Sequence, residues 1–343
     1  MAGSGAPILS VENLRVHLRS GDGAVRAVDG VSFHIAPGET LGLVGESGCG
    51  KSITALSLMS LIPNKNIEMK DGRVMFRGAD LNAKSAREMR AIRGRDIAMI
   101  FQEPMTSLNP VLKVGWQIAE TLIRHRKLSR KAAHAEAVEL LYKVGIPSPA
   151  HRATEYPHQL SGGMRQRAMI ALAIACQPAL LIADEPTTAL DVTIQAQILE
   201  LIDGLKRELD MAVLLITHNF GVVAQTADRT AVMYAGRIVE QAATRDLFER
   251  PSHPYTQGLL QAMPRLGERA VHQRHRLAEI PGIVPRLSDK RHYCSFAPRC
   301  DYRFEPCFAE QPATTPVGPE HEVRCYAQQV RLGHGRFKMD APA

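Results

Sequence analysis

Short runs of apolar residues alternating with polar ones occupy the first part of the chain, at 11–16, 28–35 and 41–44. Because alternate side chains of a strand point to the same face, these runs predict strands. After Lys51 the apolar spacing lengthens to that of a helix. The predicted helical stripe consists of Ala55, Leu58, Met59 and Ile62. We expect Pro63 to end this helix, because proline lacks a backbone N–H donor.

The middle of the chain predicts a parallel sheet interrupted by helices. Apolar runs at 180–183 and 213–216 are typical of buried strands. Between them apolar residues recur at helical spacing, at Ile194, Ile198, Leu201 and Leu205. A strand–helix–strand unit favours parallel pairing. The polar-rich segment from about 103 to 160 is predicted to be a helical insert, so the expected fold is an α/β core with this insert.

Length and composition indicate a second region. At 343 residues the chain exceeds the usual size of one domain. Beyond Arg250 proline, histidine, arginine and cysteine become frequent, which is typical of a loop-rich appendage. We therefore expect a core domain over residues 1–250 and an appendage over residues 251–343.

Charge and hydropathy restrict the location and the partners. The net charge is +7 and aromatic residues make up 5%. Since no aromatic residues interleave with the basic run at 124–131, this run is predicted to be a solvated helix face, and no nucleic-acid partner is expected. The longest uncharged apolar stretch, 168–183, is shorter than the roughly 20 residues that span a bilayer, and residues 1–13 do not resemble a secretory signal. We expect a cytoplasmic protein that serves a membrane only by docking on separate membrane subunits.

A glycine-rich segment predicts a phosphate-binding loop between a strand and a helix. It consists of Gly45, Glu46, Ser47, Gly48, Cys49, Gly50, Lys51 and Ser52. Glycines allow the backbone amides to curl around phosphates, and the helix N-terminus adds a positive dipole. Lys51 is expected to reach the terminal phosphates, and Ser52 to ligate Mg²⁺. Because a nearby lysine and a helix N-terminus lower a thiol pKa, Cys49 is expected to react with alkylating agents.

Two adjacent carboxylates, Asp184 and Glu185, follow the predicted strand at 180–183. They stand at the carboxyl end of a strand, where ligands bind in open α/β sheets. Asp184 is expected to hold Mg²⁺, directly or through water. Glu185 is expected to orient and deprotonate the water that attacks the terminal phosphate. Together with the phosphate loop, this pair indicates nucleotide hydrolysis.

A second phosphate-binding end precedes the acidic strand. In the segment Leu160-Ser161-Gly162-Gly163-Met164, the serine offers a hydroxyl, the glycines expose amides, and the following helix supplies a dipole. One Mg²⁺ site and two phosphate-binding ends in a single chain suggest sites shared between two subunits. In this order of motifs the chain resembles the ABC ATPases. The resemblance implies an antiparallel β subdomain, and implies that Ser161, Gly162 and Gly163 act on ATP held by the partner's phosphate loop.

The same resemblance assigns roles to further residues. It implies that Gln102 ligates Mg²⁺, senses the terminal phosphate and links that phosphate to the helical insert. In the turn Ala189-Leu190-Asp191, the aspartate would lie at the dimer interface. His218 would contact the terminal phosphate.

The adenine contact departs from the family pattern. These ATPases usually stack adenine on an aromatic residue at the end of an early strand. The corresponding residues here are Val16, His17 and Leu18. We expect an aliphatic contact from Leu18 or Val25, or stacking on His17, to replace the aromatic one.

Two segments outside the shared ATPase motifs carry a narrower resemblance. Residues 102–110 and 253–260 are similar to those of the ATP-binding subunits of bacterial oligopeptide and dipeptide importers. This likeness implies ATP-driven peptide uptake at the cytoplasmic face of the plasma membrane. It also implies a homologous second ATPase in a heterodimer, two permease subunits and an external binding protein. Nickel and glutathione importers share these motifs, and a soluble ABC ATPase and a redox- or iron-responsive regulator are the remaining alternatives.

Four cysteines gather in the appendage, at Cys294, Cys300, Cys307 and Cys325. Their spacing lacks the paired C-x-x-C of structural zinc sites, but four thiolates are able to bind zinc or an iron–sulfur cluster. In the importer subunits that this region resembles, four cysteines so placed hold a 4Fe–4S cluster, which implies the same here. Zinc and unmetallated thiols are the alternatives. The centre is expected to order the appendage, and its loss to leave ATP binding intact.

Overall fold

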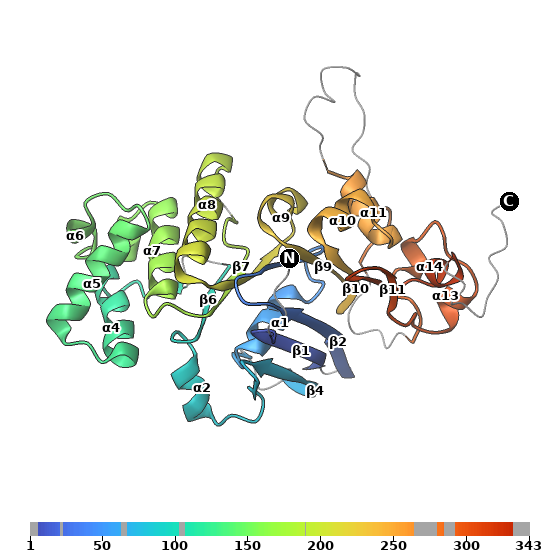
Figure 1. Cartoon of the computed structure of the whole chain (residues 1–343), viewed down its shortest axis with the longest axis horizontal. Helices are drawn as coiled ribbons and strands as arrows, with labels where there is room; N and C mark the ends of the chain where they lie inside the picture. Colours follow the sequence, from blue (N-terminus) through green and yellow to red (C-terminus); the bar gives the residue numbers. More distant parts are fainter. Residues whose placement is uncertain are drawn as a thin grey trace, which may run out of the picture.

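The strands of the computed structural model form two sheets in the part of the chain that it describes, residues 6–20, 23–62, 67–102, 107–188, 190–263, 280–284 and 292–331 (Figure 1). The smaller sheet is antiparallel and contains, in spatial order, β2 (Gly23–Ile35), β1 (Leu9–Ser20), β4 (Ile67–Phe76) and β5 (Ala79–Asp80). The alternating N-terminal runs form its first two strands, and their apolar residues Val11, Leu14 and Val16 are buried. This sheet is the antiparallel β subdomain that the resemblance implies.

The larger sheet has a parallel centre. Its parallel strands are, side by side, β9 (Arg229–Tyr234), β3 (Thr40–Val44), β8 (Ala212–Thr217), β7 (Leu180–Asp184) and β6 (Ile97–Ile100). Strands β3, β7 and β8 are buried along their whole length, as expected for a parallel sheet that is covered on both faces. The predicted parallel pairing is confirmed, whereas β6 and β9 are strands that the apolar pattern did not identify.

Helices form the insert and surround the larger sheet. The insert between β6 and β7 contains α4 (Val114–Arg126), α5 (Arg130–Lys143), α6 (Pro149–Arg152) and the short η1 (Pro157–Gln159). Its apolar side chains pack in one buried cluster with α7 (Gly162–Ile174). Other helices are α1 (Lys51–Leu58), α2 (Ala86–Ile92), α8 (Val192–Leu209), α9 (Phe220–Thr226) and α10 (Thr244–Glu249). Within the described residues, no helix has both the length and the apolar character needed to cross a membrane.

Helix α1 is shorter than its apolar stripe predicts. It ends at Leu58, because Ser60 adopts a left-handed conformation with φ 47°. The N–H groups of Ser60 and Leu61 then bond back to the carbonyls of Ser57 and Leu56, at 2.9 and 2.8 Å. This C-terminal capping motif satisfies the last turn and stops the helix before Ile62. The predicted stop at Pro63 lies outside the described residues.

The segment after residue 250 is attached to the larger sheet. Strand β10 (Arg237–Ala243) pairs with β9 on one side and with β12 (His321–Val323) on the other, and β12 pairs with β11 (Thr315–Gly318). Short helices lie around these strands: α11 (Pro254–Gln261), η2 (Ala297–Arg299), α13 (Pro306–Ala309) and α14 (Tyr326–Arg331). Figure 1 shows α13 and α14 at the end of the molecule opposite the helical insert. The appendage therefore extends the sheet of the core.

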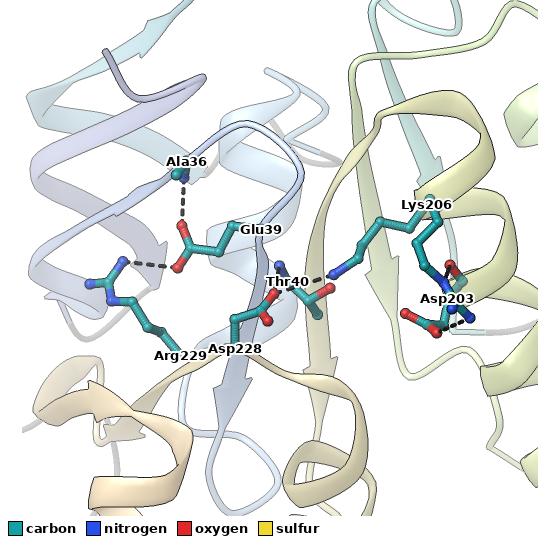
Figure 2. Close-up of polar contacts among 8 residues, drawn as sticks. Ala36, Glu39, Thr40, Asp203, Lys206, Asp228 and Arg229 are labelled. Carbon is teal, nitrogen blue, oxygen red and sulfur yellow. Dashed lines mark hydrogen bonds and ion pairs between the residues drawn. The ribbon is translucent and has the colours of Figure 1, made fainter. Parts of the chain in front are cut away.

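Polar contacts fix the N-terminal ends of β3 and β9 in the larger sheet (Figure 2). The Thr40 N–H donates to the Asp228 carboxylate at 2.7 Å, and the Lys206 ammonium lies 3.3 Å from the same oxygen. Glu39 accepts from the Ala36 N–H at 2.5 Å and pairs with the half-buried Arg229 guanidinium at 3.1 Å. These contacts tie the end of α8 to the N-terminal ends of β3 and β9, whereas the phosphate loop follows the C-terminal end of β3.

Candidate active site

The glycine-rich segment forms a tight loop between β3 and α1. Gly45 has φ 156°, and a Cβ on it would lie 2.2 Å from the carbonyl oxygen of Met233. Gly50 has φ 110°, and its Cβ would lie 2.4 Å from the carbonyl oxygen of Ala27. Larger residues would clash at both positions, so these two glycines let the loop approach the neighbouring backbone closely.

Lys51, the first residue of α1, lies inside this loop. It is 5% exposed, and its Nζ donates to the carbonyl oxygens of Gly45 at 2.8 Å and Glu46 at 3.1 Å. The ammonium group is therefore held at the centre of the curled backbone, beside the N-terminus of the helix. A polyphosphate entering the loop would meet both this charge and the free amides of the first helical turn.

The expected reactivity of Cys49 is contradicted by its environment. The residue is fully buried in the hydrophobic core, and its sulfur would be 2.9 Å from a Cβ placed on Gly45. Burial raises the pKa of the Cys49 thiol, and the charge of Lys51 lowers it by less. Tertiary packing thus outweighs the local helix dipole, and the prediction of a reactive thiolate was wrong.

Asp184 and Ser52 come together beside the loop. Asp184 ends β7 and is 3% exposed, and the Ser52 side chain beside it acts to lower the pKa of its carboxyl group. Burial raises the pKa of the Asp184 carboxyl group, and its Oδ1 atom is buried without a hydrogen-bond partner among the described residues. A carboxylate oxygen and a hydroxyl are ligands that Mg²⁺ prefers, so this pair fits the expected magnesium site.

The next residue, Glu185, is held by three side chains, two of which come from other segments of the chain. Its Oε1 lies 3.1 Å from His218 Nδ1 at the end of β8. Its Oε2 accepts from Gln102 Nε2 at 3.2 Å and from Thr188 Oγ1 at 2.7 Å. Burial alone would raise the pKa of Glu185, but the bonds with His218 and Thr188 outweigh it, and the net pKa is lowered. The carboxylate is therefore ionised and able to accept a proton.

The cluster around Glu185 contains three site residues that were predicted and one, Thr188, that was not. Gln102, Glu185 and His218 are brought together, while no hydrogen bond within the described residues joins Gln102 to Ser52 or Asp184, the other expected Mg²⁺ ligands. Thr188 was not predicted. Glu185 has a left-handed backbone with φ 47°, and the resulting tight turn places the Thr188 hydroxyl on its carboxylate.

The second phosphate-binding end, residues 160–164, is called the signature loop below. It lies apart from the phosphate loop of the same chain. Ser161 caps α7 by accepting from the Met164 N–H at 3.3 Å, and Ser161 and Gly162 are exposed while Gly163 is half-buried. Figure 1 shows α7 separated from α1. Since these groups have no phosphate site nearby in their own chain, they are available to a ligand held by another subunit.

The turn after the acidic pair is also exposed. Asp191 caps α8 by accepting from the Ile194 N–H at 2.9 Å. The adjacent Val192 is 83% exposed, which is unusual for a valine in a helix. Ala189 in the same turn lies outside the described residues, as does the 103–106 part of the segment that follows Gln102.

The predicted adenine contacts lie at the end of the smaller sheet. Val16 is fully buried, whereas His17, Leu18 and Val25 are partly exposed. Leu18 and Val25 face each other as a cross-strand pair between β1 and β2. The aliphatic pair is therefore available for an adenine ring, and Val16 is not.

The four clustered cysteines line one small cavity of about 10 Å³, walled by apolar residues such as Phe296 and Tyr326. Nearby backbone amides act to lower the pKa of each of these thiols, but burial outweighs them. Burial raises the pKa of the Cys294 thiol to about 12 and that of Cys300 to about 11. Among the described residues, no three such side chains converge closely enough to hold a single metal ion.

Comparison with protein families matches two models to this chain. Residues 28–188 match the model described as ABC transporter, and residues 239–307 match the model described as oligopeptide/dipeptide transporter, C-terminal region. The first match contains the phosphate loop, the signature loop and the acidic pair. The second contains Cys294, Cys300 and Cys307.

Known proteins are similar along nearly the whole chain. The dipeptide transport ATP-binding protein DppD of Bacillus subtilis is 51% identical over 334 residues, covering 97% of this chain and 98% of the relative. The oligopeptide transport ATP-binding protein OppD of the same organism is 49% identical, with 93% and 88% covered. Among solved structures, the dimeric ATP-binding cassette MJ0796 bound to ADP and Pi has a TM-score of 0.63 at 27% identity, covering 69% of this chain and 99% of that one.

Proposed function

Since the chain belongs to the ABC transporter family, and within it to the ATP-binding subunits of peptide importers, we propose that the cluster around Glu185 is the hydrolytic centre that powers peptide uptake. The protein is the ATP-hydrolysing subunit of an importer for dipeptides or oligopeptides. The observation that carries the assignment of the centre is the contact of Glu185 with both Gln102 and His218, next to the Asp184–Ser52 pair.

Hydrolysis follows from the roles that these positions allow. Lys51 and the loop amides bind the terminal phosphates of ATP. Ser52 and Asp184 would hold Mg²⁺, which would supply positive charge to neutralise the phosphates. Glu185 accepts the proton of the attacking water, and His218 steadies the carboxylate and contacts the terminal phosphate. Gln102 reports to the helical insert whether that phosphate is present.

A second ATPase subunit completes each site. The exposed Ser161, Gly162 and Gly163 end at a helix N-terminus, where backbone amides and the dipole favour an anion. They close on ATP bound to the partner's phosphate loop, while Asp191 and the exposed Val192 lie in the same interface. The partner is a homologous ATPase, so that the active unit is a heterodimer.

The permease subunits dock in the cleft between the core and the helical insert. This cleft has a volume of about 490 Å³ and is lined by Met99 and Phe101 from the end of β6, by Arg93, and by Glu120 and Arg124 from α4. Phe101 is 38% exposed and directly precedes Gln102, so an occupant is close to the hydrolytic centre. A short cytoplasmic segment of a permease fits this site. Docking there, with an external binding protein delivering the peptide, puts the chain at the cytoplasmic face of the plasma membrane.

The cysteine cavity holds a metal centre, a 4Fe–4S cluster. Each iron of such a cluster takes one cysteine, so its sulfur ligands stand farther apart than four ligands of one zinc ion. The four cysteines that line one cavity supply this number of ligands, which supports the cluster. Since the cavity is only about 10 Å³, the cysteines would move outward around the cluster.

Two measurements test these assignments. The importer, purified with its permease subunits and partner ATPase, should hydrolyse ATP faster when peptide-loaded binding protein is added. An unchanged rate would refute the proposed coupling of ATP hydrolysis to peptide uptake. Anaerobically purified protein should contain about four iron and four acid-labile sulfide per chain. Stoichiometric zinc without sulfide would replace the cluster, and the absence of any metal would refute the centre.

A further inference from the structure

An ion pair joins the appendage to the phosphate loop. Arg299, the last residue of η2, donates to both carboxylate oxygens of Glu46, at 2.9 Å to Oε2 and 3.2 Å to Oε1. Glu46 is the second residue of the phosphate loop, and the two residues are 253 positions apart in the chain. A two-pronged guanidinium–carboxylate contact of this kind fixes orientation as well as charge.

The rest of the Arg299 side chain is fixed in place. It is buried, with the residue 8% exposed. Its Nε donates to the carbonyl oxygen of Pro281 at 2.9 Å, and its Nη2 to that of Ile280 at 3.1 Å. The guanidinium carbon lies 5.8 Å from the centre of the Tyr234 ring. A buried charge held by so many partners cannot swing away from Glu46 without leaving polar groups unsatisfied.

A second contact reaches the backbone of the same loop residue. The Glu46 N–H donates to the hydroxyl of Tyr255, on α11, at 3.0 Å. Tyr255 is fully buried, and its ring packs against Tyr234 and Phe296 at centroid distances of 4.6 and 5.4 Å. Phe296 begins the turn that leads to Arg299. The C-terminal region therefore holds Glu46 by both its side chain and its amide.

The charge of Glu46 makes this contact relevant to ATP. A carboxylate in a loop that binds a polyphosphate repels the ligand unless a cation neutralises it, because like charges a few ångströms apart interact strongly at a partly buried site. Lys51 does not serve this purpose, since its Nζ contacts the Glu46 backbone carbonyl. Arg299 is the cation that contacts the Glu46 carboxylate in the described residues.

We propose that Arg299 is a positioning residue for ATP binding, which neutralises Glu46, fixes the phosphate loop and so couples the cysteine-bearing segment to nucleotide affinity. The inference rests on the proposed ATPase site. Arg299 directly precedes Cys300, so disorder around the cysteines is transmitted to the loop. This differs from the sequence-based expectation that loss of the cysteine centre leaves ATP binding intact.

A double-mutant cycle in the assembled importer tests the proposal. Arg299→Met should raise the KM for ATP about 10-fold or more, the usual effect of removing a hydrogen bond to a charged group, with kcat changed less than about twofold. Glu46→Gln alone gives the reference KM of a phosphate loop that lacks this carboxylate. In the double variant the neutral amide at position 46 no longer repels phosphate, so KM should return close to the Glu46→Gln value. Arg245→Met is the matched control, since it breaks an exposed Arg–Glu pair on α10, and should leave KM unchanged.

The cycle separates a positioning role from a structural one. If Arg299 only supports the fold, Glu46→Gln will not reduce the defect of Arg299→Met, and the proposal is overturned. If Arg299→Met does not fold, Arg299→Lys keeps the charge but loses the two-pronged contact. Arg299→Lys should raise KM by a smaller factor than Arg299→Met, and adding Glu46→Gln should remove this increase. A KM for Arg299→Lys equal to that of the unmodified protein would refute the proposal. An unmodified importer without ATPase activity would instead refute the proposed function.

Discussion

Glu185→Gln is the substitution that most directly probes the hydrolytic centre. Glutamine matches glutamate in size, so the side chain should keep its place among Gln102, Thr188 and His218, whose contacts with Glu185 span 2.7 to 3.2 Å. With its amide oxygen in the place of Oε2, the side chain still accepts from Gln102 and Thr188, and its NH2 group faces His218 Nδ1, which is able to accept. The amide group, however, cannot take a proton from water.

The expected magnitude follows from that lost step. General-base catalysis contributes about 10²–10⁴-fold, equal to about 2.7–5.5 kcal/mol of activation free energy. We therefore expect kcat of the assembled importer to fall at least 100-fold, while the Kd for Mg-ATP changes less than about threefold, because Lys51 and the loop are untouched. ATP turnover and ATP binding, measured on the same preparation, give the two numbers.

A control isolates the chemistry from the change of charge. Glu200→Gln alters an exposed glutamate on α8 and should retain full turnover. Near-normal turnover in Glu185→Gln would show that another group accepts the proton. A loss of ATP binding as large as the loss of turnover would show that Glu185 acts on the loop and not on water.

Three further outcomes follow from the structure. Burial acts to raise the pKa of Glu185, and the Thr188 hydroxyl helps to lower it. Thr188→Val should therefore raise the pKa of Glu185 and move the acid limb of the kcat–pH profile to higher pH. An acid limb that does not move would contradict a role of Thr188 in setting this pKa. Because burial raises the pKa of the Cys49 thiol, iodoacetamide should label Cys49 only after unfolding, and rapid labelling of native protein would refute this. A Cβ on Gly204 in α8 would meet nothing within 4 Å, so Gly204→Ala should increase the free energy of unfolding by about 0.5–1 kcal/mol in urea titrations.

Local pattern was sufficient for the central strands but not for the edges of the sheet. Strands β3, β7 and β8 are rich in apolar residues, and the helix between β7 and β8 predicted their parallel pairing. Strand β6 has four residues and β12 has three, too few to show a period. Strand β12 is stabilised by pairing with β10, about 80 positions earlier in the chain, and β11 by pairing with β12. A contact with so distant a segment leaves no local signal.

The site residues also fall into those that local sequence predicts and those that depend on contacts between distant segments. The phosphate loop was predictable because its glycines, Lys51 and Ser52 are neighbours in sequence. Gln102 and His218 lie 83 and 33 positions from Glu185, and the resemblance to a family, not their spacing, pointed to them. The burial of Cys49 and the contact of Arg299 with Glu46 depend on the packing of distant segments, so the sequence could reveal neither.

Uptake of a labelled peptide into vesicles tests the central claim most directly. The vesicles would contain the permease subunits, the partner ATPase and this chain, with the binding protein added on the opposite side. We predict that uptake requires ATP on the side that carries this chain, and that Glu185→Gln abolishes uptake without preventing assembly of the complex. Peptide uptake that proceeds without ATP, or that persists at full rate in the Glu185→Gln importer, would contradict the account.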